Sequence, residues 1–257
     1  MTALHSRQTP PVQISSLILG VCAACAVHAE FTDDFNSGND AGWTHYEPIA
    51  SFGAPVTYSF PSGGYQISVA GSPLPLVVGP GRGGSFRTDC VLTDFQLSYD
   101  LVAWGTTPAF AGGFARVSDL GVGTTDGYAL GFDFSDNTLF ISRVRNEDVE
   151  AVVASTAVAA LDPSHQYQLT YWGVGTQLAG TIRDLTAGVD LATVSGIDDA
   201  YSVGIVGLGV VVQSLSPGIG GTATFDNFSA SVPEPSSWVL MVVGSLALVG
   251  WTRRSNR

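Results

Sequence analysis

Two short acidic motifs near the ends of the chain have the residue types of a metal site. Asp33-Asp34-Phe35 and Asp226-Asn227-Phe228 are near copies separated by almost the whole sequence. Calcium takes about six to eight hard oxygen ligands, which carboxylates and carbonyls supply. If the first and last strands pair, Asp34 and Asp226 would converge as ligands of a structural calcium. The alternative is turn and cap chemistry, which Asp and Asn also favour.

Catalytic constellations are harder to assemble from this sequence. Glycoside hydrolysis needs two carboxylates about 5–9 Å apart across the scissile bond. The densest acidic cluster, Glu147-Asp148-Val149-Glu150, follows Arg143 and Arg145 and is interpreted as a solvated hairpin loop, with the arginines paired to nearby acids. Only His45 and His165 lie beyond residue 30, and no Ser-His-Asp triad can be assembled around them from the sequence. We therefore expect no enzymatic activity and no certain cofactor, structural calcium being the one candidate.

Aromatic side chains offer a binding chemistry instead. Trp43, Tyr46, Trp104 and Trp172 could stack against sugar rings. Most aromatic residues of a β-sandwich lie in its core, so each of them is also a candidate core residue.

The charge distribution excludes one class of partner. All 22 acidic residues lie between Glu30 and Glu234, against six arginines there, which gives this segment a net charge of −16. Such a segment repels phosphate backbones, so nucleic acid is not a partner. Cys90 is the one cysteine beyond residue 30 and is expected to be a small buried hydrophobic residue.

The elements that would position these residues are strands. Apolar residues alternate with period two in Phe95–Leu101, Tyr128–Phe134 and several further runs. Turn signals such as Asp126-Gly127 and Ser135-Asp136-Asn137 separate them. The segment from Val149 to Leu161 is compatible with a helix or with a strand and loop. The pattern predicts an all-β, antiparallel two-sheet sandwich in one domain.

The N-terminal segment has the form of a secretory signal peptide. Residues 12–27 are apolar and uncharged, and Val27-His28-Ala29 places small residues at a cleavage site. We expect signal peptidase to cut between Ala29 and Glu30; an uncleaved anchor is the alternative.

The C-terminal segment combines a motif, an apolar run and a basic end. Pro233-Glu234-Pro235 precedes 17 uncharged residues, 236–252, which span about 25 Å as a helix. Arg253 and Arg254 follow and favour the cytoplasmic side of the membrane. This predicts a single C-terminal transmembrane helix that anchors the precursor in the inner membrane.

These three elements, in this order, resemble the PEP-CTERM sorting signal of Gram-negative bacteria over residues 232–257. The resemblance implies that an exosortase recognises Pro233, Glu234 and Pro235, with Arg253 and Arg254 as the stop. It also implies a role in exopolysaccharide, biofilm or extracellular matrix. An ordinary C-terminal anchor is the alternative.

The body between the two ends is similar to concanavalin A-like, laminin-G-like jelly rolls over most of residues 31–231. The resemblance rests on the opening Phe31-Thr32-Asp33-Asp34-Phe35, the central strands and the closing Thr224–Phe228 segment. It implies that the first and last strands lie side by side, that one sheet face is concave and binds glycan, and that Asp34 and Asp226 hold calcium.

The sequence thus predicts three segments: a signal peptide (1–29), a β-sandwich domain (30–231) and a sorting signal (232–257). The expected function is that of an exported, non-enzymatic component of an exopolysaccharide matrix, at the cell surface or outside the cell, whose partners are signal peptidase, exosortase and exopolysaccharide. A structural matrix protein without a ligand and a divergent polysaccharide hydrolase are the alternatives.

Overall fold

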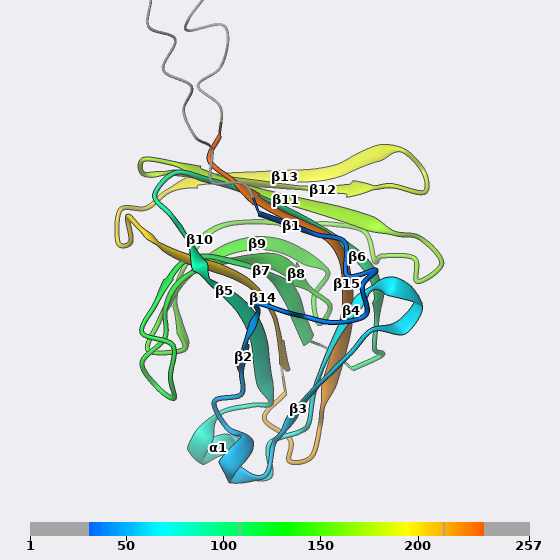
Figure 1. Ribbon diagram of the computed structural model, residues 1–257, viewed down its shortest axis with the longest axis vertical. Coiled ribbons are helices and arrows are strands. Elements are labelled where there is room, and N and C mark those ends of the chain that lie inside the picture. Colours follow the sequence, from blue (N-terminus) through cyan, green and yellow to red (C-terminus); the bar gives the residue numbers. More distant parts are fainter. Residues whose placement is uncertain (1–30, 108, 213, 234–257) are drawn as a thin grey trace, which may run out of the picture.

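The computed structural model describes residues 31–107, 109–212 and 214–233, and these form two packed antiparallel sheets (Figure 1). The eight-stranded sheet has the order β13-β12-β11-β6-β15-β4-β3, with β1 also paired to β15. Its strands are β1 (Phe31–Asp33), β3 (Val56–Ser59), β4 (Tyr65–Val69), β6 (Phe95–Trp104), β11 (Tyr167–Val174), β12 (Gln177–Asp184), β13 (Val189–Ile197) and β15 (Gly221–Ser231).

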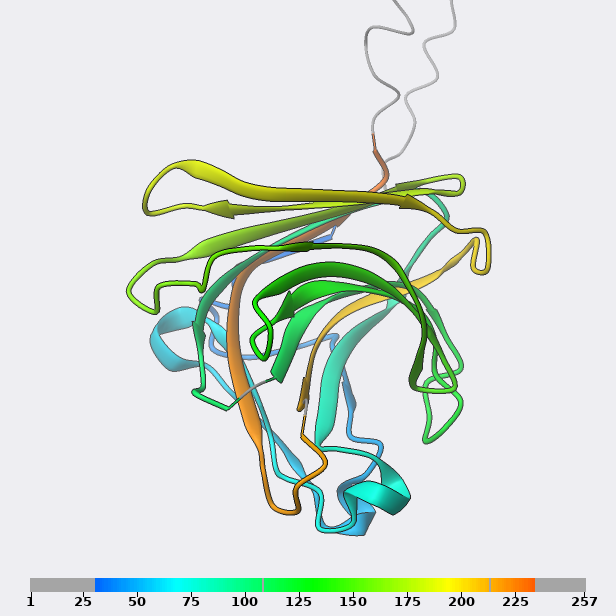
Figure 2. The same cartoon turned by 180° about the vertical axis from the view of Figure 1, so that it is seen from behind.

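The seven-stranded sheet has the order β10-β9-β8-β7-β14-β5-β2. Its strands are β2 (Thr44–Tyr46), β5 (Arg82–Leu92), β7 (Ala109–Ser118), β8 (Asp126–Asp133), β9 (Thr138–Arg145), β10 (Asp148–Ala157) and β14 (Gly204–Val212). The described part of the chain also has three short helices in connections, η1 (Ala50–Phe52), η2 (Pro61–Gly63) and α1 (Pro75–Val78). Seen from behind, this sheet is strongly curled beneath the flatter β11–β13 part of its neighbour (Figure 2). The predicted all-β, two-sheet sandwich is confirmed.

The core between the sheets follows the alternation in the sequence. In β6, Phe95, Leu97, Tyr99 and Leu101 are fully buried, while the intervening Gln96 is exposed. Side chains two apart on a strand share a face, so each such strand contributes one apolar row to the interior. Cys90 is buried, as predicted. The segment that was compatible with a helix forms strand β10 up to Ala157.

The first and last strands of the described chain lie side by side. Phe31 pairs with Ala230 and Asp33 with Phe228, in antiparallel register. This is the arrangement that the jelly-roll resemblance implied, and it brings the two acidic motifs to the same edge of the molecule.

Within the described residues, no helix has the length and apolar character needed to cross a bilayer. The predicted C-terminal helix, residues 236–252, and the predicted signal peptide lie outside the described residues.

Candidate functional site

The outer face of the seven-stranded sheet carries a row of phenylalanines. Ala109 and Ala111 point into the core between the sheets, so Phe110 and Phe114 project from the opposite face of β7. By the same alternation Phe140 projects outward from β9, and its ring centroid lies 5.3 Å from that of Phe110. The rings of Phe110 and Phe114 are 5.8 Å apart and meet edge to face. This outer face is therefore an aromatic floor.

Glycines let these rings lie close against the strands. A Cβ atom at Gly131 would stand 2.2 Å from the Phe110 ring, and one at Gly209 would stand 2.8 Å from the Phe114 ring. Both distances are too short for real side chains, so only glycine permits the rings to cover the backbone at these points. The rings can cover the backbone because Gly131 and Gly209 have no side chains.

An ion pair spans this face. Arg82 at the start of β5 binds both carboxylate oxygens of Glu147, with Nε–Oε1 at 3.0 Å and Nη2–Oε2 at 2.8 Å. Strands β5 and β9 are separated by three strands in the sheet order. The pair can form only because the sheet curls enough to bring its distant parts together, so the aromatic floor lies on the concave side.

Glu147 occupies a turn position that normally suits glycine. Asn146 and Glu147 connect Arg145 to Asp148, and both have positive φ, 53° and 69°. A two-residue hairpin turn of this kind favours Asn-Gly, because a side chain is strained there. The carboxylate compensates by accepting hydrogen bonds from Arg82, from the Tyr46 hydroxyl and from the Gly123 backbone N–H. The strained turn therefore fastens the β9–β10 hairpin to β2, β5 and the loop before β8.

These contacts set the ionisation of the cluster. Burial by itself raises the pKa of Glu147, but hydrogen bonds from Arg82, Tyr46 and Gly123 outweigh it and lower the pKa below its ordinary value of 4.5. Burial, followed by hydrogen bonding to Glu147, raises the pKa of Tyr46. At neutral pH the site holds a charged guanidinium and carboxylate and a neutral phenol.

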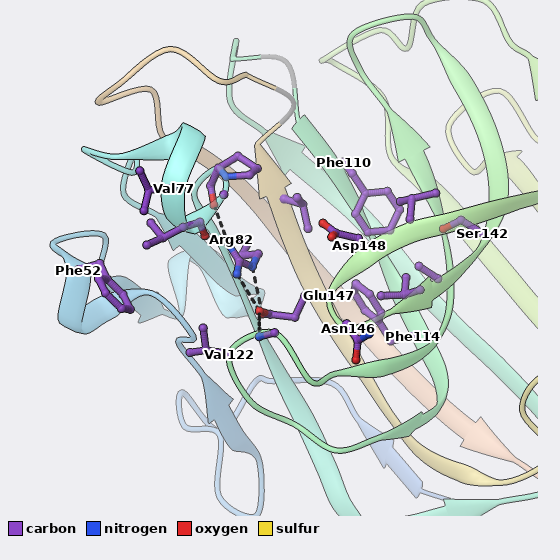
Figure 3. Close-up of a pocket in the computed structure, with 18 of the residues that line it drawn as sticks. Phe52, Val77, Arg82, Phe110, Phe114, Val122, Ser142, Asn146, Glu147 and Asp148 are labelled. Atoms are coloured by element: carbon purple, nitrogen blue, oxygen red, sulfur yellow. Dashed lines mark hydrogen bonds and ion pairs between the residues drawn. The ribbon is translucent and has the colours of Figure 1, made fainter.

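A cavity of about 530 Å³ lies above the aromatic floor (Figure 3). Its polar lining includes Ser142 and Asn146 beside the Arg82–Glu147 pair. Phe52, Val77 and Val122 lie on the side toward η1 and α1, across from Phe110 and Phe114. The volume falls within the range of roughly 300–1,000 Å³ that is usual for small-ligand sites.

The hairpin acids differ from the sequence interpretation. Glu147 was interpreted as part of a solvated loop, but its side chain is only 6% exposed and is paired with Arg82. Its partners are 65 and 101 residues away in sequence, so no local pattern could indicate them. Arg143 and Arg145 do pair with a nearby acid, Glu150, at 2.7 and 2.8 Å.

The aromatic residues singled out from the sequence do not converge on one surface. Trp43 is buried, and its ring packs 5.0 Å from that of Phe228. Trp104 stacks on Phe134 at 5.1 Å, and Trp172 is exposed on β11 of the other sheet. Tyr46 alone reaches the site, through Glu147. The floor is made of phenylalanines. The sequence signal that could have indicated them is their place at the outward-facing positions of alternating strands.

Asp34 and Asp226, the predicted calcium ligands, lie close enough to influence each other. Burial raises the pKa of Asp226 above its ordinary 3.8, and repulsion from Asp100 and Asp34 adds to it. Asp100 is the direct cross-strand partner of Asp226. A group of three or more His, Cys, Asp or Glu side chains arranged to hold a metal is absent from residues 31–107, 109–212 and 214–233.

The hydrogen bonds of Asp34 and Asp226 are local turn contacts, which were the alternative to calcium binding in the sequence analysis. Asp34 accepts from the Asn36 backbone N–H at 3.1 Å, and Asp226 accepts from that of Asn227 at 2.7 Å. The carboxylate oxygens of Asp34 and Asp226 are too few to complete a calcium coordination shell, which would also need carbonyl oxygens and water. Calcium at Asp34 and Asp226 stays a prediction.

Most residues of the predicted processing sites lie outside the described residues. This holds for Ala29 and Glu30 at the expected signal cleavage, and for Glu234, Pro235, Arg253 and Arg254 in the sorting signal. Pro233 is described and follows strand β15 by two residues.

Comparison with protein families identifies the C-terminal segment. Residues 231–254 match the PEP-CTERM protein-sorting motif. The prediction of this motif is confirmed, and it marks the chain as an exported, sorted protein. No curated protein matches the chain.

Comparison with solved structures identifies the fold. The carbohydrate-binding module CBM66 from Bacillus subtilis has a TM-score of 0.51 at 18% identity, covering 74% of this chain and 96% of that one. A Bacillus subtilis protein of unknown function with a galectin-like fold has a TM-score of 0.56 at 13% identity, covering 79% and 96%. Winged bean acidic lectin complexed with methyl-α-D-galactose has a TM-score of 0.53 at 14% identity, covering 79% and 98%. The body is therefore a lectin-like jelly roll of the concanavalin A-like class, as predicted.

Proposed function

We propose that this chain is a non-enzymatic glycan-binding protein of an extracellular polysaccharide matrix. The observation that carries the proposal is the cavity of about 530 Å³ on the concave face, with an aromatic floor and polar groups beside it. Aromatic rings suit the apolar faces of sugars, and a few placed polar groups fix their orientation. Two proteins of similar fold support it: one is a carbohydrate-binding module and one was complexed with methyl-α-D-galactose.

The charge state of the cavity favours binding over hydrolysis. Glu147 is ionised and its oxygens already accept hydrogen bonds from Arg82, Tyr46 and Gly123. A general acid for glycoside cleavage must hold a proton, and its pKa is raised rather than lowered. Asp148 is the other carboxylate among the described residues that line the cavity. Because Glu147 is ionised and already hydrogen-bonded, Glu147 and Asp148 do not form a catalytic pair.

We propose the following route of delivery. Signal peptidase cuts between Ala29 and Glu30, and residues 236–252 hold the precursor in the inner membrane of a Gram-negative bacterium. An exosortase then recognises Pro233-Glu234-Pro235, and Arg253 and Arg254 retain the end of the chain in the cytoplasm. The match to the PEP-CTERM motif supports this route.

The mass of the protein recovered outside the cell tests the route. We expect a species that begins at Glu30 and lacks the segment after the Pro-Glu-Pro motif. An extracellular species that retains Arg253 and Arg254 would contradict exosortase processing.

Binding to exopolysaccharide from the producing organism tests the glycan proposal. Protein expressed from the full gene should bind the polysaccharide, and Phe114→Ala should weaken binding at least tenfold by removing part of the floor. Trp172→Ala is the matched control, because it removes an exposed aromatic ring from the other sheet. Equal binding by both variants would place the site elsewhere. No binding by wild type would favour a structural matrix protein, and release of reducing sugar would favour a hydrolase.

A further inference from the structure

The mouth of the cavity is apolar, which is unusual for a surface exposed to water. Phe52 is 45% exposed, Val77 77%, Val122 52% and Val149 60%, and they come from four separate segments. Apolar side chains that gather around a pocket rather than scatter over the surface mark a binding site. With the phenylalanine floor, they give the cavity two apolar sides.

One buried polar group indicates that the ligand is not a hydrocarbon. Ser142 lines the cavity from β9 and is only 1% exposed, yet its hydroxyl has no hydrogen-bond partner among the residues that the structure describes. A buried hydroxyl without a partner costs about 1–3 kcal/mol. A ligand that offers a hydroxyl or carbonyl there would remove this penalty, and an alkyl chain would not.

The charges around the cavity disfavour an anionic ligand. The guanidinium of Arg82 is committed to Glu147, and its Nη1 donates to the carbonyls of Val78 and Pro80 at 2.8 and 3.2 Å. Asp148 adds a negative charge to the lining. A uronic acid would find Arg82 already paired with Glu147. It would also be repelled by Asp148 and by the strongly negative net charge of the segment.

From these three observations we infer that the cavity binds a neutral sugar residue carrying a small apolar substituent, such as the methyl group of a deoxy sugar or an acetyl group. This inference rests on the proposed function and names its substrate class. The sugar ring lies on the phenylalanine floor, the substituent contacts the apolar mouth, and a ring hydroxyl or the acetyl carbonyl pairs with Ser142.

Matched monosaccharide pairs test the inference by titration calorimetry. The pairs are galactose with 6-deoxygalactose, glucose with N-acetylglucosamine, and glucose with glucuronic acid. Burying one methyl-sized group contributes about 0.8 kcal/mol, which is about fourfold in affinity. We expect 6-deoxygalactose and N-acetylglucosamine to bind at least fourfold more tightly than their parents, and glucuronic acid to bind more weakly than glucose.

Three variants locate the effect. Val122→Ser should remove the preference for the substituted sugars, while Val174→Ser, an equally exposed valine on β11 outside the cavity, should not. Ser142→Ala should weaken the binding of all the sugars, because it removes the hydroxyl and leaves the phenylalanine floor unchanged.

The outcomes separate this inference from the proposed function. Equal affinity within each pair, or a preference for glucuronic acid, overturns the inference and leaves glycan binding standing. Tighter binding of octanol than of any sugar also overturns it. Absence of binding to every sugar and to the native polysaccharide overturns both.

Discussion

Two arginines that lie near opposite ends of β14, Arg82 and Arg116, have different roles in this fold. Val211 of β14 pairs with Arg82 of β5, whereas Ile205 pairs with Val117, the neighbour of Arg116. Arg82 spans the concave face of one sheet and ends on a carboxylate. Arg116 turns inward at a β-bulge, with φ of 51°, and its side chain is 1% exposed.

The hydrogen-bond partners of Arg116 are backbone carbonyls in three loops, and the Asp94 carboxylate lies 3.8 Å from its Nη2. Arg116 donates to Thr93 at 2.8 Å, to Tyr201 at 3.0 Å and to Gly175 at 2.8 Å. These lie in the connections that join β5 to β6, β13 to β14 and β11 to β12. Arg116 therefore closes one end of the sandwich, while Arg82 shapes a cavity. The difference shows that a guanidinium stabilises the fold when it binds carbonyls of several connecting loops, and shapes a site when it bridges the open face of one sheet.

The largest expected effect is the loss of Arg116. Arg116→Met leaves three carbonyl oxygens without their donor, and each costs about 1–3 kcal/mol, so we expect the free energy of unfolding to fall by about 5 kcal/mol. Urea unfolding measures it. Because this is about a third or more of the stability of an ordinary domain, Arg116→Lys serves as a second variant and should be destabilised less than Arg116→Met. A change below about 1 kcal/mol in Arg116→Met would contradict the role of Arg116.

Glu147→Gln should destabilise the fold less than Arg116→Met does, but should weaken glycan binding more. The change leaves Arg82 without a counter-charge, and breaking a buried pair costs about 3–5 kcal/mol; the amide keeps one acceptor, which favours the lower end. We expect about 3 kcal/mol by urea unfolding, together with loss of polysaccharide binding. Unchanged binding would show that the Arg82–Glu147 pair does not shape the cavity.

The pH dependence of Glu147 sharpens the same test. Its folded pKa is lowered below 4.5, so its contribution is present above pH 4.5 and is lost as pH falls through the folded pKa. The stability difference between wild type and Glu147→Gln should therefore be largest near neutral pH and should shrink below pH 4.5. A difference that does not change with pH would mean that the charge of Glu147 is not what stabilises the hairpin.

The architecture was accessible from sequence because strand alternation is a local signal. Runs such as Phe95–Leu101 show which side of a strand is buried, and in β6 the four apolar residues of this run are fully buried, as the pattern predicts. The segment from Val149 was ambiguous because valine and alanine suit an edge strand as well as an apolar helix. It forms β10, paired only with β9 in the sheet order.

The site was not accessible in the same way, because its contacts are long-range. Glu147 looked solvated because charged and polar residues flank it on both sides of the turn, and only the curl of the sheet brings Arg82 to it. Trp43 was a candidate for sugar stacking or for the core, and it lies in the core. Phe110 and Phe114 face outward, which the FAGGF spacing allows but does not distinguish from core packing.

The acidic edge, formed by Asp34, Asp100 and Asp226, extends the comparison to carboxylates that have no arginine partner among the described residues. If Asp34 and Asp226 bind calcium, the ion replaces the missing counter-charge. At a concentration tenfold above its dissociation constant, calcium would stabilise the fold by about 1.4 kcal/mol. We expect thermal melts to show a higher melting temperature in calcium than in chelator for wild type, and no difference for Asp226→Asn. Identical wild-type melts would remove calcium from Asp34 and Asp226.

The smallest expected effect is the relief of repulsion at Asp226 in the presence of chelator. Burial, with Asp100 and Asp34, raises the folded pKa of Asp226 above 3.8, so the protonated form favours the fold and the charged form opposes it. Asp226→Asn should therefore be more stable than wild type at pH 7, by no more than about 1 kcal/mol for a partly exposed charge. Wild type should regain this difference as pH falls through the raised pKa, and the two proteins should melt together below pH 3.8. Asp199→Asn removes one exposed acid with the same change in net charge, so an equal gain there would assign the effect to the overall charge of the chain rather than to the acidic edge.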